Sequence, residues 1–176
     1  LMAAEAALEK GANVSVYDAM PSVARKFLMA GKSGLNISNS EEEEPFRSRF
    51  RAPDGRLAQC LEAFGPRDVV SWMDELGIAS FTGSSGRVFP VAMKASPLLR
   101  SWLDRLRSAG AVIHVRHRWT GWAEDGALIL ETPQGERRVK ADACVLALGG
   151  ASWSRLGSDG AWAELLAARG VVIEPF

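Results

Sequence analysis

The sequence has few of the residues that build metal centres and disulfide frameworks. Among 176 residues there are two cysteines and two histidines. Cys60 and Cys144 lie far apart and in no metal-binding or redox spacing, so we expect both to be reduced thiols in the core. His114 and His117 have a spacing that does not place both side chains on one face of a strand. We therefore expect no metal site.

The sequence also lacks a long hydrophobic run and an excess of charge of either sign. No apolar run approaches the roughly 20 residues of a membrane helix, and no cationic leader precedes an apolar signal core. We therefore expect a cytoplasmic protein with no membrane partner. Lysine plus arginine and aspartate plus glutamate number 21 each, which does not indicate a nucleic-acid-binding surface.

Both ends of the chain resemble the interior of a longer protein. Residues 1–10 form a strongly helical segment that Gly11 is expected to end, but they include no initiator methionine at position 1 and no N-cap. Residues 170–176 have the pattern of a strand that leads into further sequence. We expect a chain cut at both ends that is long enough for one domain with its own core.

The first half of the chain predicts helices that flank a short strand. Residues 14–18 alternate between apolar and polar side chains and end in an acid, which indicates a strand. Residues 66–76 predict a helix that Gly77 ends. A second helix is expected to begin at the N-cap Ser96, with Pro97 in its first turn, and to end at Gly110. The core-facing residues of the two helices are predicted to be Val69, Val70, Trp72, Met73 and Leu76, and Leu98, Leu99, Trp102, Leu103 and Leu106.

The second half predicts strands and one more helix. Residues 111–142 contain the turn signals "EDG" and "PQG" between apolar segments, which predicts a small antiparallel meander. Residues 143–148, "ACVLAL", have the pattern of a parallel strand buried on both faces, and Gly149–Gly150 follow. Ser158 is the expected N-cap of a last helix, which Gly170 ends.

Helix, strand and acid follow one another as in a dinucleotide-binding βαβ unit whose first strand and glycine turn lie outside the sequence. In such a unit the pyrophosphate lies at the N-terminus of the first helix, and an acid after the second strand binds ribose hydroxyls. Asp18 stands at that acid's position. The expected fold class is therefore α/β: a partial Rossmann domain with a small antiparallel β-meander.

Residues 25–40, "RKFLMAGKSGLNISNS", combine cations, glycines and amides soon after the first strand. Arg25 and Lys26 can pair with phosphate, and Gly31 and Gly34 let the backbone approach a ligand closely. Neutral donors and acceptors follow at Asn36, Ser38 and Asn39. The alternative is a solvent-exposed loop with a surface cation pair, although the interleaved apolar residues indicate a loop folded against protein. The residues by themselves leave both interpretations open.

The glycine pair after the apolar run allows a second contact with a cofactor. Gly149 and Gly150 would bring backbone close to a ligand at the carboxyl edge of a parallel sheet; an ordinary turn after a strand is the alternative. Ser152, Trp153 and Ser154 are near enough in sequence to line the same pocket or to form an ordinary loop. No pair of acids, histidine base or activated nucleophile is evident, so no catalytic residue is predicted.

Three long motifs in this order resemble a known family. Residues 17–41, 86–106 and 145–171 are similar to the HI0933-like family of two-domain bacterial flavoproteins, which includes BaiN-type NAD(P)/FAD-dependent oxidoreductases. The most similar subfamily is one of uncharacterised flavoproteins. The resemblance spans essentially the whole chain. It implies noncovalent FAD in a glutathione-reductase-like domain, a second domain that is inserted after the last helix and covers the flavin, and an incomplete FAD-binding domain over residues 1–176.

The resemblance also implies roles for single residues. It places Asp18 on the adenosine ribose, Arg25 and Lys26 beside the adenine and phosphates, and residues 31–36 along the pyrophosphate and flavin. The strand at Trp119 would present backbone to the adenine. The cofactor-binding residues expected are Asp18, Arg25, Lys26, Gly31, Lys32, Gly34, Asn36, Trp119, Ala147, Gly149 and Gly150. Much of the family has an Arg-Cys pair where Gly34–Leu35 precede Asn36, so thiol chemistry at that place is not carried over.

The activity that the resemblance implies is that of a flavin-dependent oxidoreductase. Such an enzyme takes hydride from NAD(P)H and reduces an unsaturated small-molecule substrate; relatives act on steroid-like compounds and, in one branch, on uridine of ribosomal RNA. Two alternatives remain: a flavin- or nucleotide-binding module without turnover, and a fragment that binds no cofactor because its phosphate turn lies outside the chain. We expect the parent protein to be an enzyme and this chain to be inactive alone.

Overall fold

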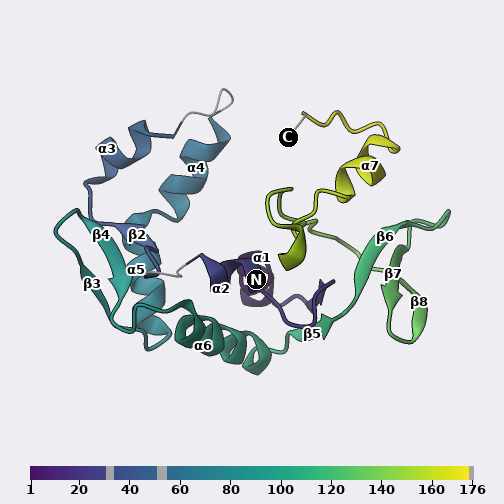
Figure 1. The fold of residues 1–176 in the computed structure, drawn as a ribbon, viewed down its shortest axis with the longest axis horizontal. Coiled ribbons are helices and arrows are strands. Elements are labelled where there is room, and N and C mark those ends of the chain that lie inside the picture. The colour runs from purple at the N-terminus through teal and green to yellow at the C-terminus, as the bar shows by residue number, and fades with distance from the viewer. Residues whose placement is uncertain (31–33, 51–54, 175–176) are drawn as a thin grey trace. The chain divides into compact units, whose positions relative to one another are not determined.

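A computed structural model describes residues 1–30, 34–50 and 55–174. The chain divides into two compact units (Figure 1): unit 1 comprises residues 1–26 and 106–176, and unit 2 comprises residues 27–105. The helices are α1 (Met2–Glu9), α2 (Arg25–Met29), α3 (Glu43–Ser48), α4 (Arg56–Ala63), α5 (Pro66–Glu75), α6 (Ala95–Ser108), η1 (Ser154–Leu156) and α7 (Trp162–Ala167). The strands are β1 (Ser15–Asp18), β2 (Ser38–Asn39), β3 (Ser80–Thr82), β4 (Arg87–Pro90), β5 (Val112–Val115), β6 (Arg118–Trp122), β7 (Leu128–Thr132) and β8 (Gly135–Val139).

Unit 1 contains a parallel pair of strands, as expected of an α/β fold. β1 pairs with β5 in parallel, with Tyr17 opposite His114 and Asp18 opposite Val115. α1 precedes β1 and ends before Gly11, whose φ of 78° is left-handed. Glycine adopts this conformation without the steric cost that other residues have, so the predicted end of the helix is confirmed.

The predicted meander is confirmed in unit 1 for residues 118–139, whereas residues 112–115 form β5 and pair with β1 instead. β7 lies between β6 and β8, and both pairings are antiparallel. The register between β6 and β7 shifts at residues 119–121, which indicates a β-bulge. Trp119 and Trp122 lie edge to face with ring centroids 4.7 Å apart, and the Arg169 guanidinium is 5.2 Å from the Trp122 ring.

The prediction of a buried parallel strand at residues 143–148 is wrong. These residues form no strand, and the Val145 side chain is 71% exposed. A strand buried in a parallel sheet needs partners for its backbone N–H and C=O groups. In the described part of the chain, the parallel strands β1 and β5 pair only with each other. Residues 143–148 therefore make no backbone pairing with either strand.

The last helix begins later than the sequence indicates. α7 starts at Trp162, so the prediction of Ser158 as its N-cap is wrong. Ser158 instead forms an isolated bridge with Trp153, and a carboxylate oxygen of Asp159 accepts the Ala161 N–H at 3.1 Å. Gly170, with φ of 79°, follows the helix as predicted.

Unit 2 contains a hydrophobic core. α5 and the part of α6 within this unit contribute to it together with the segment before β2, as the apolar spacing of both helices predicts. Trp72 and Trp102 lie edge to face with ring centroids 4.8 Å apart. The buried cluster comprises Leu35, Trp72, Met73, Leu76, Ala95 and Leu98. The sheet of unit 2 has the strand order β2-β4-β3 and is antiparallel.

Two expectations about details of this unit are wrong. α6 begins at Ala95, so Ser96 lies inside the first turn and is not the N-cap. Cys60, on α4, is exposed, as is Cys144 in unit 1. Both thiols are free, as expected, but neither lies in a core: α4 has no buried residue, and the segment around Cys144 joins no strand.

The charged segment of residues 41–50 lies at the surface, and part of it is helical. α3 has no buried residue. Arg47 forms an ion pair with Glu43 one turn earlier at 2.5 Å, and Arg49 pairs with Glu41 at 2.6 Å. The Arg47–Glu43 pair has the i,i+4 spacing, and pairs of this kind stabilise an exposed helix by a few tenths of a kcal/mol, roughly 0.2–0.5.

The two histidines lie together, contrary to the inference from their spacing. Their ring centroids are 5.3 Å apart. The inference assumed a continuous strand, but β5 ends at Val115 and Arg116 has a left-handed φ of 58°. That conformation interrupts the alternation of side chains along the chain, and the His117 ring lies beside that of His114.

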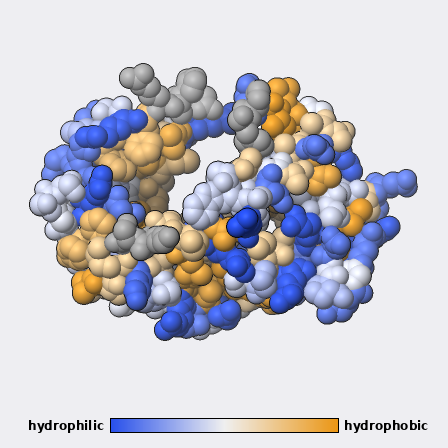
Figure 2. Space-filling model, viewed as in Figure 1, coloured by the Kyte–Doolittle hydropathy of each residue, from blue (hydrophilic) through white to orange (hydrophobic). Residues whose placement is uncertain are grey.

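Apolar and polar side chains are both visible on the face of the molecule in Figure 2, where orange and blue residues alternate. Such scatter is normal for folded proteins. No helix within residues 1–30, 34–50 and 55–174 is long and apolar enough to cross a membrane.

Candidate functional site

The predicted cofactor residues are divided between the two units. Seven of them lie in unit 1: Asp18, Arg25, Lys26, Trp119, Ala147, Gly149 and Gly150. Gly34 and Asn36 lie in unit 2. Gly31 and Lys32 fall outside the described residues. The arrangement inside unit 1 therefore forms the candidate site.

Lys26 is joined to the loop after the glycine pair. Its ammonium donates to Ser152 Oγ at 2.9 Å and to Ser158 Oγ at 3.4 Å. These partners are neutral hydroxyls, and Lys26 forms no ion pair with any acid that the structure describes. The positive charge of this exposed side chain is therefore available to an anion.

Ser158 links that ammonium to the glycine pair. Its side chain is buried, and its Oγ donates to the Gly150 carbonyl at 2.9 Å. Gly149 has a left-handed φ of 74°, and a Cβ at this position would lie 3.1 Å from Ser158 Oγ. The turn thus requires glycine for two reasons, its backbone conformation and its closeness to Ser158. Lys26 and Gly149–Gly150, which the sequence analysis assigned to one ligand, are brought together by this serine.

Asp18 lies at the carboxyl end of the parallel pair, where Rossmann-type folds bind ligands. One carboxylate oxygen accepts the Met20 N–H at 2.8 Å. No described residue donates to its other oxygen. Backbone bonds from His117 to Asp18 and from Arg116 to Met20 hold the segments after β1 and β5 together. The carboxylate is half-buried and keeps one oxygen for a further donor.

A second contact ties β6 to the loop before α7. An Arg118 guanidinium nitrogen lies 3.3 Å from a carboxylate oxygen of Asp159. The Ala161 backbone N–H, followed by Arg118, holds the pKa of Asp159 below its ordinary value. This contact joins the loop that carries Ser152 and Ser158 to the meander.

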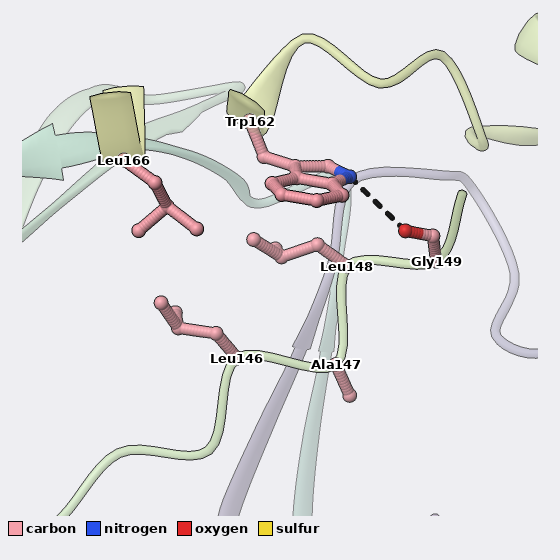
Figure 3. A pocket seen from close by; sticks show the side chains of 6 residues that line it. All are labelled: Leu146, Ala147, Leu148, Gly149, Trp162 and Leu166. Atoms are coloured by element: carbon pink, nitrogen blue, oxygen red, sulfur yellow. Dashed lines mark hydrogen bonds between the residues drawn. The ribbon is translucent and has the colours of Figure 1, made fainter. Parts of the chain in front are cut away.

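An apolar cavity lies next to Gly149. It has a volume of about 270 Å³ and is lined by Leu146, Ala147, Leu148, Gly149, Trp162 and Leu166. Figure 3 shows Leu146 and Leu148 directed toward Trp162 and Leu166, while Ala147 points away. The Trp162 indole N–H donates to the Gly149 carbonyl at 3.0 Å. Gly149 is therefore shared by the cavity and the Lys26 cluster.

The remaining predicted residues lie apart from these contacts or form other ones. Gly34, in unit 2, has φ of 146°, and a Cβ there would lie 2.6 Å from Met93 Cε. The close approach that this glycine allows is to protein. Asn36 is exposed. In unit 1, Arg25 begins α2, and the buried Trp119 Nε1 has no described hydrogen-bond partner.

Comparison with known proteins gives the family. The sequence profile of the HI0933-like protein Rossmann domain matches residues 1–176. The chain belongs to the HI0933-like family. This assignment confirms the resemblance and, with the parallel pair β1–β5, the Rossmann-type α/β fold. Rossmann-type domains bind nucleotides. No curated protein matches the sequence.

A solved structure supports the fold of this HI0933-like chain. The chain is similar to the crystal structure of Thermovibrio ammonificans THI4, with 15% sequence identity and a TM-score of 0.53. The match covers 84% of this chain and 52% of that chain. The chain thus spans about half the length of the structure that it matches, and at this identity the likeness concerns the fold alone.

The central residue of the cluster, Ser158, is not evident from the sequence. Its place in the sequence favours a helix cap, and Ser152 has only its nearness to the glycine pair. The signal that points to Ser158 is its position between Gly157 and an acid, outside the apolar repeat of α7. A short hydroxyl side chain next to a glycine is typical of turns that bond their own backbone.

Proposed function

We propose that this chain is the FAD-binding part of a flavin-dependent oxidoreductase. The observation that carries the proposal is the Lys26 ammonium, which is held by two hydroxyls and no described acid beside the Gly149–Gly150 turn. Family membership adds a Rossmann domain around it. An unpaired cation next to a glycine turn is what the phosphates of a dinucleotide require.

The residues present fit the adenosine diphosphate half of FAD. Lys26 would hold a phosphate oxygen, and the second oxygen of Asp18 would accept a ribose hydroxyl. The glycine pair leaves room for backbone to approach the phosphates, because neither glycine has a side chain. When bound, FAD supplies the hydride-transfer chemistry, and the chain supplies binding and orientation.

Electron donor and substrate are further parts of the proposal. Through the family resemblance, NAD(P)H is the donor and an unsaturated small molecule is the acceptor. No described residue forms a nucleophile–base pair, so the chain's role is to bind the cofactor. A flavin-binding module without turnover is the alternative, and the two differ in one result: only the oxidoreductase passes electrons from NAD(P)H to an added acceptor.

The test is whether the protein retains FAD, which visible absorbance after incubation and desalting measures. A fluorescence titration then gives the dissociation constant. Lys26→Gln removes the charge and should weaken FAD binding about tenfold or more, because hydrogen bonds to charged groups contribute roughly 1.5–3 kcal/mol. Asp18→Asn should weaken it as well. Lys10→Gln, an exposed lysine after α1, is the matched control and should leave the affinity unchanged. Equal affinity of the Lys26→Gln and wild-type proteins would overturn the assignment of the site.

A further inference from the structure

Ser158 has a feature that FAD binding by Lys26 and Asp18 does not explain. Its side chain is only 4% exposed, although it is polar and lies in a loop. Buried hydroxyl groups are costly unless they are hydrogen-bonded. The burial of this serine therefore depends on specific partners, and these are the two elements of the proposed phosphate site.

The hydroxyl group has a fixed direction. A serine hydroxyl has one hydrogen to donate and two lone pairs to accept. The hydrogen goes to the Gly150 carbonyl, with Oγ and O 2.9 Å apart. The lone pairs are left for other donors, and Lys26 Nζ lies 3.4 Å away. That distance is long for a hydrogen bond, but the ammonium charge still favours a lone pair aimed at it.

The position of the hydroxyl is fixed by the backbone as well. Ser158 and Trp153 exchange two backbone hydrogen bonds of 3.1 Å each, which closes the loop that contains η1. Gly157, just before the serine, has a left-handed φ of 88°, and a Cβ there would lie 2.8 Å from Met20 Cγ. Met20 follows Asp18 in the turn after β1. The loop that carries Ser158 is thus held against the end of that strand.

Lys26, in contrast, has no rigid attachment of its own. It is exposed, and its shorter bond is to Ser152, which is also exposed. A lysine side chain loses up to about 2 kcal/mol of rotamer entropy when it is held in one place. If a buried, fixed acceptor already holds the lysine side chain in the free protein, less rotamer entropy is lost when a ligand binds.

We propose that Ser158 is a positioning residue that fixes both the Lys26 ammonium and the Gly149–Gly150 turn for the phosphate groups of a dinucleotide. This inference rests on the proposed function, because it needs an anionic ligand at Lys26. It adds that the affinity depends on a residue that need not touch the ligand.

A double-mutant cycle tests the proposal, with FAD as the probe. Ser158→Ala should weaken FAD binding about fivefold to tenfold, because it leaves the Gly150 carbonyl without its donor and Lys26 without its fixed acceptor. In a Lys26→Gln background the same change should have a clearly smaller effect, because only the part that acts through the Gly149–Gly150 turn remains. A serine that only stabilises the loop would give additive losses. Ser154→Ala, an exposed serine in η1, is the matched control and should not change the affinity.

A second measurement needs no ligand. Reductive ¹³C-methylation makes each lysine visible by NMR, and the Lys26 signal is assigned from the Lys26→Gln variant. Ser158→Ala should shift that signal in the folded protein, whereas Ser154→Ala should not. Circular dichroism and the melting temperature show whether each variant folds.

The outcomes separate the inference from the function on which it rests. Coupling in the cycle and a shifted Lys26 signal support the positioning role. If the wild-type protein binds FAD but the losses are additive and the signal stays in place, the positioning role is overturned and the function stands. If folded wild-type protein binds no FAD, the proposed function fails and with it the role in ligand binding, whatever the Lys26 signal shows.

Discussion

Tyr17, His114 and His117 form one cluster of rings near the carboxyl ends of β1 and β5. Tyr17 stacks on His114 with centroids 4.6 Å apart and planes 9° apart, and it lies 5.7 Å from His117. Partial burial, followed by the neighbouring His117 and Arg137, lowers the pKa of His114. The folded protein therefore favours the neutral imidazole at position 114, because a charged ring would lose hydration and be repelled by its neighbours, among them the Arg137 guanidinium.

The lowered pKa of His114 predicts a protein that is less stable in mild acid. The unfolded chain binds this proton at an ordinary pKa of about 6.5, and the folded protein only at lower pH. The contribution of neutral His114 to the free energy of unfolding is therefore complete above about pH 6.5. It is lost as the pH falls toward the pKa that His114 has in the folded protein. The free energy of unfolding at about pH 7.5 and about pH 5.5, from urea titration, measures it.

His114→Phe keeps a ring stacked on Tyr17 and removes the titration. This variant should lose less stability between the two pH values than the wild-type protein. The effect should be small, because the ring is only partly buried. An identical loss in both proteins would show that other groups cause the pH dependence.

Among the elements, α5 and α6 supply buried side chains to the core of unit 2. α6 has 14 residues, and an isolated helix of about this length is only marginally stable in water, so its stability comes mostly from the packing of its apolar face. Met73 and Leu98 are fully buried. The pair Trp72–Trp102 adds an edge-to-face contact of the kind worth about 0.5–1.5 kcal/mol beyond burial. The stability of unit 2 should therefore be concentrated in this pair of helices.

Leu98→Ala should destabilise the protein by about 2–5 kcal/mol, because it removes buried methyl groups and leaves a cavity. Urea denaturation followed by tryptophan fluorescence measures the change near Trp72 and Trp102. Val91→Ala is the control, since the Val91 side chain is 62% exposed and such surface changes alter stability by about 0.5 kcal/mol or less. Similar losses in the two variants would contradict the core assigned to unit 2.

At the scale of the whole molecule, the exposed run at residues 143–148 stands out. Val145 is 71% exposed, and Leu146 is 36% exposed beside it. Single exposed apolar residues are common, whereas a continuous run with unpaired backbone favours association between chains. We expect this run to limit the solubility of the chain.

Val145→Glu should reduce self-association without lowering the melting temperature, because the side chain has no core contacts to lose. Light scattering and size-exclusion chromatography over a concentration series measure the association. Val91→Glu changes a similarly exposed valine that lies in a turn, and it should have the smaller effect. A large drop in melting temperature for Val145→Glu would mean that the run is buried in solution.

The sequence by itself determined the elements whose signals are local. The ends of α1 and α7 follow from Gly11 and Gly170, because glycine adopts a left-handed conformation at little cost. The meander follows from turn signals between apolar segments. The three long motifs indicated the family, and the apolar spacing of α5 and α6 predicted residues of the core of unit 2.

Only the tertiary structure decided which distant residues meet. An apolar run has the same pattern whether or not a neighbouring strand exists, so residues 143–148 were assigned to a strand that does not form. Arg116 brings the two histidines together through a single left-handed residue, which no spacing rule anticipates. Ser158 reaches Lys26 across 132 positions of sequence. A hydroxyl group bonds whichever donor and acceptor the fold places around it, and its sequence neighbours do not specify them.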